Sequence, residues 1–286
     1  MTVGATRLSK LTWSLQDRNP GDILVSAAPI PEMATVLADR NATGRGIRVC
    51  VVDSGIEGDH PAVGPVGSSW AVMKEGGNIR VEKCNAGDIC GHGTACAGII
   101  RKLAPECELH SVRVLGKLYS GTADVLLEGL RWSIQQRFDV INLSLSTTRF
   151  RFAEELRALA DEAYFNGTLI VASAHNTPVE SFPWRFASVV SVGSHQEDAA
   201  ELFLYNPRPP VEFFAPGRDL EVAWLGGEFI RATGNSFAAP FIAGLAARIL
   251  SHQPHLTPFQ LKTVLYLSAA NVSVSPVSTV TTAADR

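Results

Sequence analysis

The stretch GIRVCVVDSG, residues 46–55, decides the fold of this chain. Its centre, VCVV at 49–52, is apolar throughout, and an Asp-Ser-Gly turn follows it. A short apolar run that ends in a turn predicts a strand buried on both faces, as in a parallel sheet. Ligand sites in such sheets lie outside the carboxyl ends of the strands. Asp53, directly after this strand, is therefore a candidate site residue.

Similar strand-like runs alternate with helical patterns along the rest of the chain. Strands are predicted at 107–116, 139–146, 168–176, 187–194 and 211–217, and helices at 92–103, 120–138, 152–167, 236–253 and 257–269. This alternation predicts an α/β fold, with a mainly parallel central sheet and helices on both faces. We expect a loop-rich lead-in over 1–45, one domain over 46–270 and a disordered tail over 271–286.

Composition excludes several classes of protein. Of the 286 residues, 46% are hydrophobic and 19% charged, which is typical of a globular domain. The net charge of −3 gives no basic excess for nucleic acid, and no apolar run is long enough to span a membrane. The first 22 residues lack the apolar stretch of a secretory signal, and the five cysteines are an odd number. We therefore expect reduced thiols and a cytoplasmic protein.

A histidine and a serine join Asp53 at the predicted sheet edge. In CGHGTACAGII, residues 90–100, His92 stands between two glycines at the start of a helix, and Ser236 opens another helix after the residues ATG. Each of the three residues alone has an ordinary explanation: His92 as a structural histidine, Ser236 as a helix N-cap and Asp53 as a turn residue. Together, at the mouth of one sheet, they indicate nucleophilic catalysis.

The predicted roles follow from the chemistry of the three groups. Ser236 is the nucleophile, His92 the base that takes its proton, and Asp53 the group that orients the imidazole. Asn176 follows the strand LIVAS and is predicted to aim its amide at the oxyanion, together with the Ser236 backbone N–H. Small residues after His92, namely Ala95, Ala97 and Gly98, are expected to let its helix lie flat on the sheet.

Three motifs resemble those of the subtilisin-like serine proteases, the subtilases. VVDSGIEGDHP (51–61) resembles the family's aspartate motif, GHGTACAG (91–98) its histidine motif, and GNSFAAP (234–240) its serine motif. Their order is the family's order, and the resemblance runs from about residue 45 to 270. It implies a three-layer fold, endopeptidase activity, an acyl-enzyme intermediate and a protein or peptide substrate. Pro240 is expected in the first turn of its helix, where proline is tolerated.

The resemblance also implies a substrate cleft. Its edges and the walls of the pocket for the residue before the scissile bond are expected to be Leu115, Gly116, Lys117, Ser144, Leu145, Ser146, Ala172, Ser173, Ala174 and His175. His175 and Ser146 stand where the family usually has glycine. The His175 side chain either narrows the pocket and tilts Asn176, or points into a gap that accommodates it.

No metal or cofactor is expected. The segment after the His92 helix lacks the loop that binds calcium in the family, and the spacings of Cys84, Cys90 and Cys96 do not fit a metal-binding cysteine pair. With no evident pro-segment, the chain either folds without one or is controlled by a separate inhibitor or regulator. The expected function is a serine endopeptidase with a dedicated intracellular substrate. The alternative is a pseudoprotease that binds peptides without cleaving them.

Overall fold

The computed structural model describes residues 37, 39, 41–85, 87–116, 121–196 and 202–273, which lie in one compact unit, Ala34–Arg286. The predicted lead-in and tail fall mostly outside these residues. None of the helices in the described ranges is both long and apolar enough to span a bilayer.

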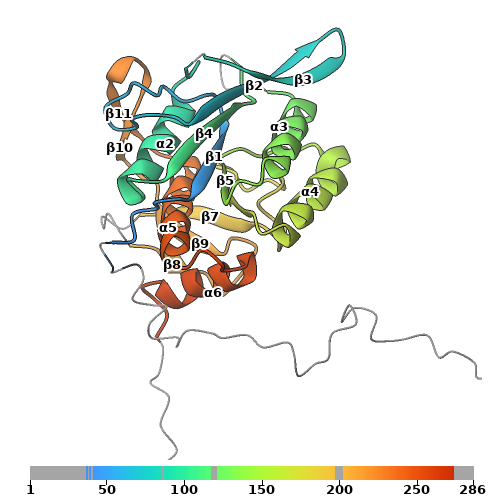
Figure 1. Ribbon diagram of the computed structural model, residues 1–286. Coiled ribbons are helices and arrows are strands. Elements are labelled where there is room, and N and C mark those ends of the chain that lie inside the picture. The colour runs from blue at the N-terminus through green and yellow to red at the C-terminus, as the bar shows by residue number, and fades with distance from the viewer. Residues whose placement is uncertain are drawn as a thin grey trace, which may run out of the picture. The chain divides into compact units, whose positions relative to one another are not determined.

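A nine-stranded sheet forms the centre of the unit (Figure 1). Its order is β3 (Asn78–Lys83), β2 (Ser68–Glu75), β4 (Glu108–Arg113), β1 (Arg48–Asp53), β5 (Val140–Leu143), β6 (Leu169–Ser173), β7 (Val190–His195), β9 (Phe213–Pro216) and β8 (Leu204–Tyr205). The inner strands pair in parallel, and only the outermost pairs, β3 with β2 and β8 with β9, are antiparallel. The prediction of a mainly parallel sheet is confirmed.

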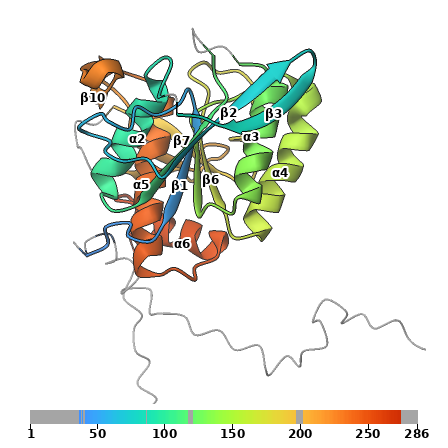
Figure 2. The ribbon, with the colours of Figure 1, turned by 45° about the horizontal axis from the view of Figure 1, so that its top comes forward.

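Helices cover both faces of this sheet (Figure 2). One face carries α2 (His92–Leu103) and α5 (Asn235–His252), and the other carries α3 (Ala123–Gln135) and α4 (Ala153–Phe165). A further helix, α6 (Pro258–Ser268), packs against α5. The three-layer architecture expected from the sequence is confirmed, and α4 ends as predicted, with Asn166 as its C-cap and Gly167 at φ 87°.

Two hairpins lie outside the sequence-based prediction. One is β2–β3, and the other joins β10 (Leu220–Ala223) to β11 (Phe229–Ala232) in a separate small sheet. Most side chains of β2 and β3 are at least partly exposed, so these strands lack the continuous apolar run that identifies the buried ones. The glycines at their turn, Gly76 and Gly77, have φ 56° and 89°, as a tight hairpin turn requires.

Small residues set the spacing of the helices around α2. Ala95 and Ala97 are fully buried, as expected. The prediction for Gly98 was wrong. A Cβ built on Gly98 would lie 3.1 Å from the Cβ of Ala223, so this glycine makes room for β10 and not for the central sheet. On α5, a Cβ placed on Gly244 would lie only 2.8 Å from the Cβ of Leu103, so α2 and α5 pack backbone to backbone at this point.

We expect Gly244→Ala to lower the free energy of unfolding by up to about 2 kcal/mol. Overpacking against Leu103 costs about 1–3 kcal/mol, and the higher helix propensity of alanine returns about 1 kcal/mol. Urea unfolding measures the difference. The matched variant Gly98→Ala, whose new methyl group meets Ala223 at 3.1 Å, should change stability much less. Equal effects at both positions would contradict the close packing of α2 and α5.

Candidate active site

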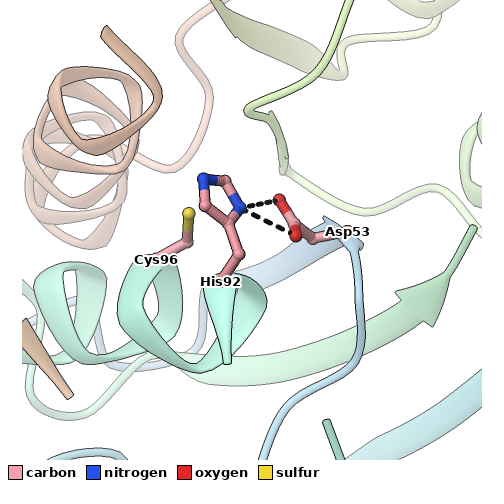
Figure 3. A group of neighbouring side chains, drawn as sticks. All are labelled: Asp53, His92 and Cys96. Carbon is pink, nitrogen blue, oxygen red and sulfur yellow. Dashed lines mark hydrogen bonds and ion pairs between the residues drawn. The ribbon is translucent and has the colours of Figure 1, made fainter. Parts of the chain in front are cut away.

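The structure brings Asp53 and His92 into direct contact (Figure 3). The last residue of β1 and the first of α2 meet so that His92 Nδ1 lies 2.9 Å from each carboxylate oxygen of Asp53. Asp53 is completely buried, and its Oδ1 also accepts a hydrogen bond of 2.8 Å from the Ser54 N–H. Asp53 thus holds the Nδ1 side of the imidazole, and the His92 side chain keeps 12% of its surface exposed.

The glycines that flank His92 allow this contact. Gly91 has φ 89°, and a Cβ on it would lie 2.6 Å from the ring of Trp224. A Cβ on Gly93 would lie 2.0 Å from the carbonyl oxygen of Gly55, a distance that no side chain tolerates. Glycine is therefore required on both sides of His92: at 91 because of the positive φ and the Trp224 ring, and at 93 because the helix starts in direct contact with the loop after β1.

Asp88 is a site residue that the sequence analysis missed. Its carboxylate accepts hydrogen bonds from the N–H and hydroxyl of Thr94, both at 2.8 Å, and from the Cys90 N–H at 3.0 Å. It therefore ties the loop before α2 to the first turn of that helix. An acidic residue at a helix N-terminus is a common stabilising device, and this one stands four residues before His92.

Opposing effects act on the pKa of His92. Burial of the imidazole lowers it, whereas the charge of Asp53 and its hydrogen bond raise it, and the charge of Asp88 adds to the rise. The net result is a pKa above the usual 6.5. Asp53 thus favours the imidazolium form, which is what a base needs once it has taken a proton.

Ser236 stands at the start of α5, and its surroundings correct one expectation. The helix begins at Asn235, so Pro240 lies inside the helix and not in its first turn. Proline has no N–H to donate to the carbonyl four residues before it, which is that of Ser236. The Ser144 hydroxyl donates to this carbonyl instead, at 2.7 Å, and so joins the start of α5 to the segment after β5.

Asn176 lies beside Ser236 with a defined amide orientation. Its Oδ1 accepts a hydrogen bond of 2.9 Å from the Asn235 backbone N–H. A Cβ built on Gly234 would lie 3.2 Å from Ser236 Oγ and 3.5 Å from Asn176 Nδ2, so these two groups face the same small space. The amide NH₂ of Asn176 and the Ser236 backbone N–H, which as the second residue of a helix has no intrahelical acceptor, are donors at this point.

The Asn235 side chain connects the Asn176 segment to the sheet. Its Nδ2 donates to the carbonyl of His175 at 3.0 Å, and its Oδ1 accepts from the N–H and hydroxyl of Ser194 in β7, at 2.8 and 2.9 Å. Nothing in the sequence pattern pointed to this link, since it joins segments 41 and 60 residues apart.

A cavity of about 550 Å³ lies beside these groups. It is lined by most of the predicted site residues, namely His92, Leu115, Ser144, Leu145, Ser146, Ser173, Ala174, His175, Asn176 and Ser236. Gly116 lines a neighbouring cavity with Leu115, and Lys117 lies outside the described residues. Ala172 corrects the prediction: it lies within β6, is fully buried in the core and lines no part of the cavity, which begins at Ser173, the last residue of the strand.

The His175 imidazole is fixed by its neighbour. Its Nδ1 lies 3.1 Å from the Thr177 N–H and 2.8 Å from the Thr177 hydroxyl. Because the N–H can only donate, Nδ1 is the acceptor and the neutral ring carries its proton on Nε2. The Asn176 amide keeps its hydrogen bond from the Asn235 N–H, so the neighbouring His175 side chain does not tilt that amide.

Trp224 is the second residue that the sequence analysis missed. It lines the cavity together with Ala232, Thr233 and Phe237, and its ring covers Gly91. The β10–β11 hairpin that carries it was not predicted, so no sequence signal placed it there.

Cys96 completes the one group of three potential metal ligands in the described part of the chain (Figure 3). Ligand atoms of Asp53, His92 and Cys96 lie within 4.8 Å of one another. Burial, and then the charge of Asp53, raise the pKa of the Cys96 thiol well above its usual range. A thiol that keeps its proton is a weak ligand, so the residues present fit proton transfer better than metal binding.

Comparisons with known proteins agree with this geometry. The profile of the Subtilase family matches residues 44–283. Subtilisin DY of Bacillus licheniformis is 30% identical over 247 residues, covering 81% of this chain and 86% of that protein. Subtilisin E of Bacillus subtilis (strain 168) is 30% identical over 244 residues, covering 80% of this chain but only 62% of its own length.

A solved structure is similar as well. The crystal structure of a cold adapted subtilisin-like serine proteinase superimposes with a TM-score of 0.65 at 28% sequence identity. The match covers 80% of this chain and 84% of that one.

The raised pKa of His92 can be measured without any assay of activity. We expect its imidazole to titrate above pH 6.5 in NMR spectra of the intact chain, and Asp53→Asn to lower that pKa because burial then acts without the neighbouring charge. The control is Asp59→Asn, which neutralises an exposed carboxylate on the loop after β1. It should leave the titration of His92 unchanged. Titration of His92 at or below pH 6.5 in the intact chain would contradict the electrostatic analysis.

Proposed function

The chain belongs to the subtilase family and is a subtilisin-like serine endopeptidase, and we propose that Asp53, His92 and Ser236 are its catalytic triad. The observation that carries this assignment is the double contact of His92 Nδ1 with the buried Asp53 carboxylate, at the border of a cavity that Ser236 also lines.

In the proposed mechanism, Ser236 Oγ attacks the carbonyl carbon of the scissile bond while His92 Nε2 takes its proton. The imidazolium is stabilised by Asp53, then protonates the leaving amine as the peptide bond breaks and an acyl-enzyme remains. A water molecule, deprotonated by the same imidazole, hydrolyses the ester and restores Ser236. Because only neutral imidazole accepts a proton, activity should fall as the pH drops through the raised pKa of His92.

Asn176 and the Ser236 backbone N–H are proposed as the oxyanion hole. The bond from the Asn235 N–H to Asn176 Oδ1 supports this role, because it leaves the NH₂ group of the amide to donate. A donor whose orientation is set before the reaction pays no reorganisation cost when charge develops.

The proposed substrate is an extended segment of a protein or peptide. It would lie between the edge at Leu115–Gly116 and the edge at Ser144–Ser146, with the residue before the scissile bond in the cavity beside Ser173, Ala174 and His175. Glycine is usual at positions 146 and 175 in the family, so the side chains present here would make this pocket smaller. A dedicated intracellular substrate, and a separate inhibitor or regulator, are part of the proposal.

We also propose that the protein acts in the cytoplasm. Cys50, Cys84, Cys96 and Cys107 are free thiols, and Cys50, Cys96 and Cys107 are buried. Thiols persist in a reducing compartment. Fractionation of cells that produce the tagged protein tests the location directly.

A fluorophosphonate probe and a peptide library test the function together. The wild-type chain should be labelled at Ser236 and should cut library peptides at sites mapped by mass spectrometry, with and without EDTA. Ser236→Ala should abolish both labelling and cleavage, because the nucleophile is lost. Ser181→Ala, which removes a buried hydroxyl bonded to Trp184 outside the catalytic cavity, is the matched control and should retain both.

Three results separate the alternatives. Labelling of Ser236 contradicts the pseudoprotease that only binds peptides. Absence of labelling and cleavage in a folded wild-type chain would favour it. Loss of cleavage in EDTA would contradict the prediction of a metal-free site.

Asn176→Ala should lower kcat by about 10²–10³ with little change in KM, because the amide acts on the oxyanion and not on the bound substrate. Asn166→Ala replaces an exposed asparagine at the C-cap of α4 and serves as the control. Steady-state kinetics on one peptide from the library measures both parameters. A rise in KM of the same size with kcat unchanged would assign Asn176 to substrate binding.

A further inference from the structure

A second, larger cavity adjoins the catalytic one. Its volume is about 850 Å³, and its walls come from β2, the start of α3 and the loop that follows Ser146. Its lining residues include Lys74, Asp124, Arg149, Phe150 and Arg151. The proposed mechanism uses none of these side chains.

The two arginines of this cavity carry charge that the described residues do not neutralise. Neither Arg149 nor Arg151 forms an ion pair with any carboxylate in the described ranges, and both are exposed. The cavity's own acidic residue, Asp124, is bonded to Lys74. Hydrogen bonds from Lys74 and Thr122 lower the pKa of Asp124 to about 2, so this charge stays paired with Lys74.

The nearest acidic residues along the chain do not change this balance. Glu154 and Glu155 lie in the first turn of α4: Glu155 is paired with Arg131 of α3, and neither residue lines the cavity. Across the described residues the cavity therefore has two unpaired positive charges, although the whole chain carries a net charge of −3.

The loop also exposes an aromatic side chain. Phe150, between the two arginines, is 60% exposed and meets the edge of the Phe182 ring at 5.5 Å. The Arg151 guanidinium lies over the ring of Phe152 at 4.6 Å, which orients it without neutralising it. Exposed aromatic and arginine side chains on one loop are the residue types that protein interfaces favour.

Two residues connect this cavity to the catalytic one. Ser146 and His175 line both, and a smaller cavity of about 170 Å³ lies between Leu115 and Ser146. A strand bound between the two cleft edges, with its scissile bond at Ser236, therefore passes from the catalytic cavity towards Arg149 and Arg151. Trp224 and Thr233 line the catalytic cavity but not the larger one.

From these observations we infer that Arg149 and Arg151 select substrates that carry aspartate or glutamate a few residues before the scissile bond. The inference rests on the proposed function, since the direction of the substrate follows from the assigned cleft. The arginines would act on carboxylates through charge and hydrogen bonds, with Phe150 covering the adjacent part of the peptide. The substrate class is thus an acidic extended segment.

Synthetic peptides with one shared cleavage site test this inference. The site is taken from the library experiment, and Asp, Ala or Lys is placed in turn at the second to sixth residue before it. At the position nearest the arginines, the wild type should favour Asp over Lys by about two- to fivefold in kcat/KM, within the range expected for exposed ion pairs. The preference should shrink in 0.5 M NaCl, which screens exposed charges.

Charge variants of the two arginines provide the decisive comparison. R149Q/R151Q should remove the preference, and R149E/R151E should invert it in favour of Lys. The control K102E/R208E makes the same change in net charge at two exposed residues that line none of the cavities described above, and should keep the wild-type preference. A small fluorophosphonate, which has no residues before the reactive phosphorus, should label Ser236 equally in all variants and so report that the catalytic centre is intact.

The outcomes separate this inference from the proposed function. Cleavage that depends on Ser236 but shows no preference for acidic residues, or a preference that R149E/R151E leaves unchanged, overturns the inference alone. Absence of both labelling and Ser236-dependent cleavage overturns the proposed function and the inference with it. If Ser236 is labelled but library peptides are not cut, peptidyl phosphonates with Asp or Lys at the same positions measure the preference as a labelling rate.

Discussion

The candidate site depends on the close approach of Gly93 to the carbonyl of Gly55, where even a methyl group would come within 2.0 Å of the oxygen. This approach places the first residue of α2 against the end of β1, so an imidazole on the helix reaches a carboxylate on the strand. The carboxylate of Asp53 is buried, and burial without partners would be costly. The Ser54 N–H and His92 supply those partners, which links the stability of the strand end to the geometry of the site.

Sequence reasoning predicted the parts of this site that depend on order along the chain. The buried strand before Asp53, the helix that starts at His92 and the serine at the start of α5 were all placed correctly. Each of these follows from local pattern: apolar runs, glycines at a turn and the composition of a helix N-terminus. Parallel strands then bring the three positions to one edge of the sheet. Their meeting could therefore be predicted from the topology, without knowledge of side-chain contacts.

The remaining features depend on contacts between distant segments, which a single sequence does not encode in a readable pattern. Asn235 bonds to His175 and Ser194, and Trp224 covers Gly91 from a hairpin that was not predicted. The burial of Ala172 was missed because the sequence of a strand does not show which of its residues line the cleft. The surplus charge at Arg149 and Arg151 is likewise visible only once the pairing of Asp124 with Lys74 is known.

Pro240 has a consequence for how this chain can change over time. Because proline leaves the Ser236 carbonyl without its helical donor, the Ser144 hydroxyl satisfies that carbonyl from another wall of the cleft. The tolerance of position 144 to substitution therefore depends on the residue at position 240. With proline at 240, loss of the hydroxyl leaves this carbonyl with only the weak Cys96 thiol contact at 3.7 Å, whereas a residue with an N–H at 240 would donate to it along the helix. The two positions form an epistatic pair, and mutational histories that alter one are constrained by the state of the other.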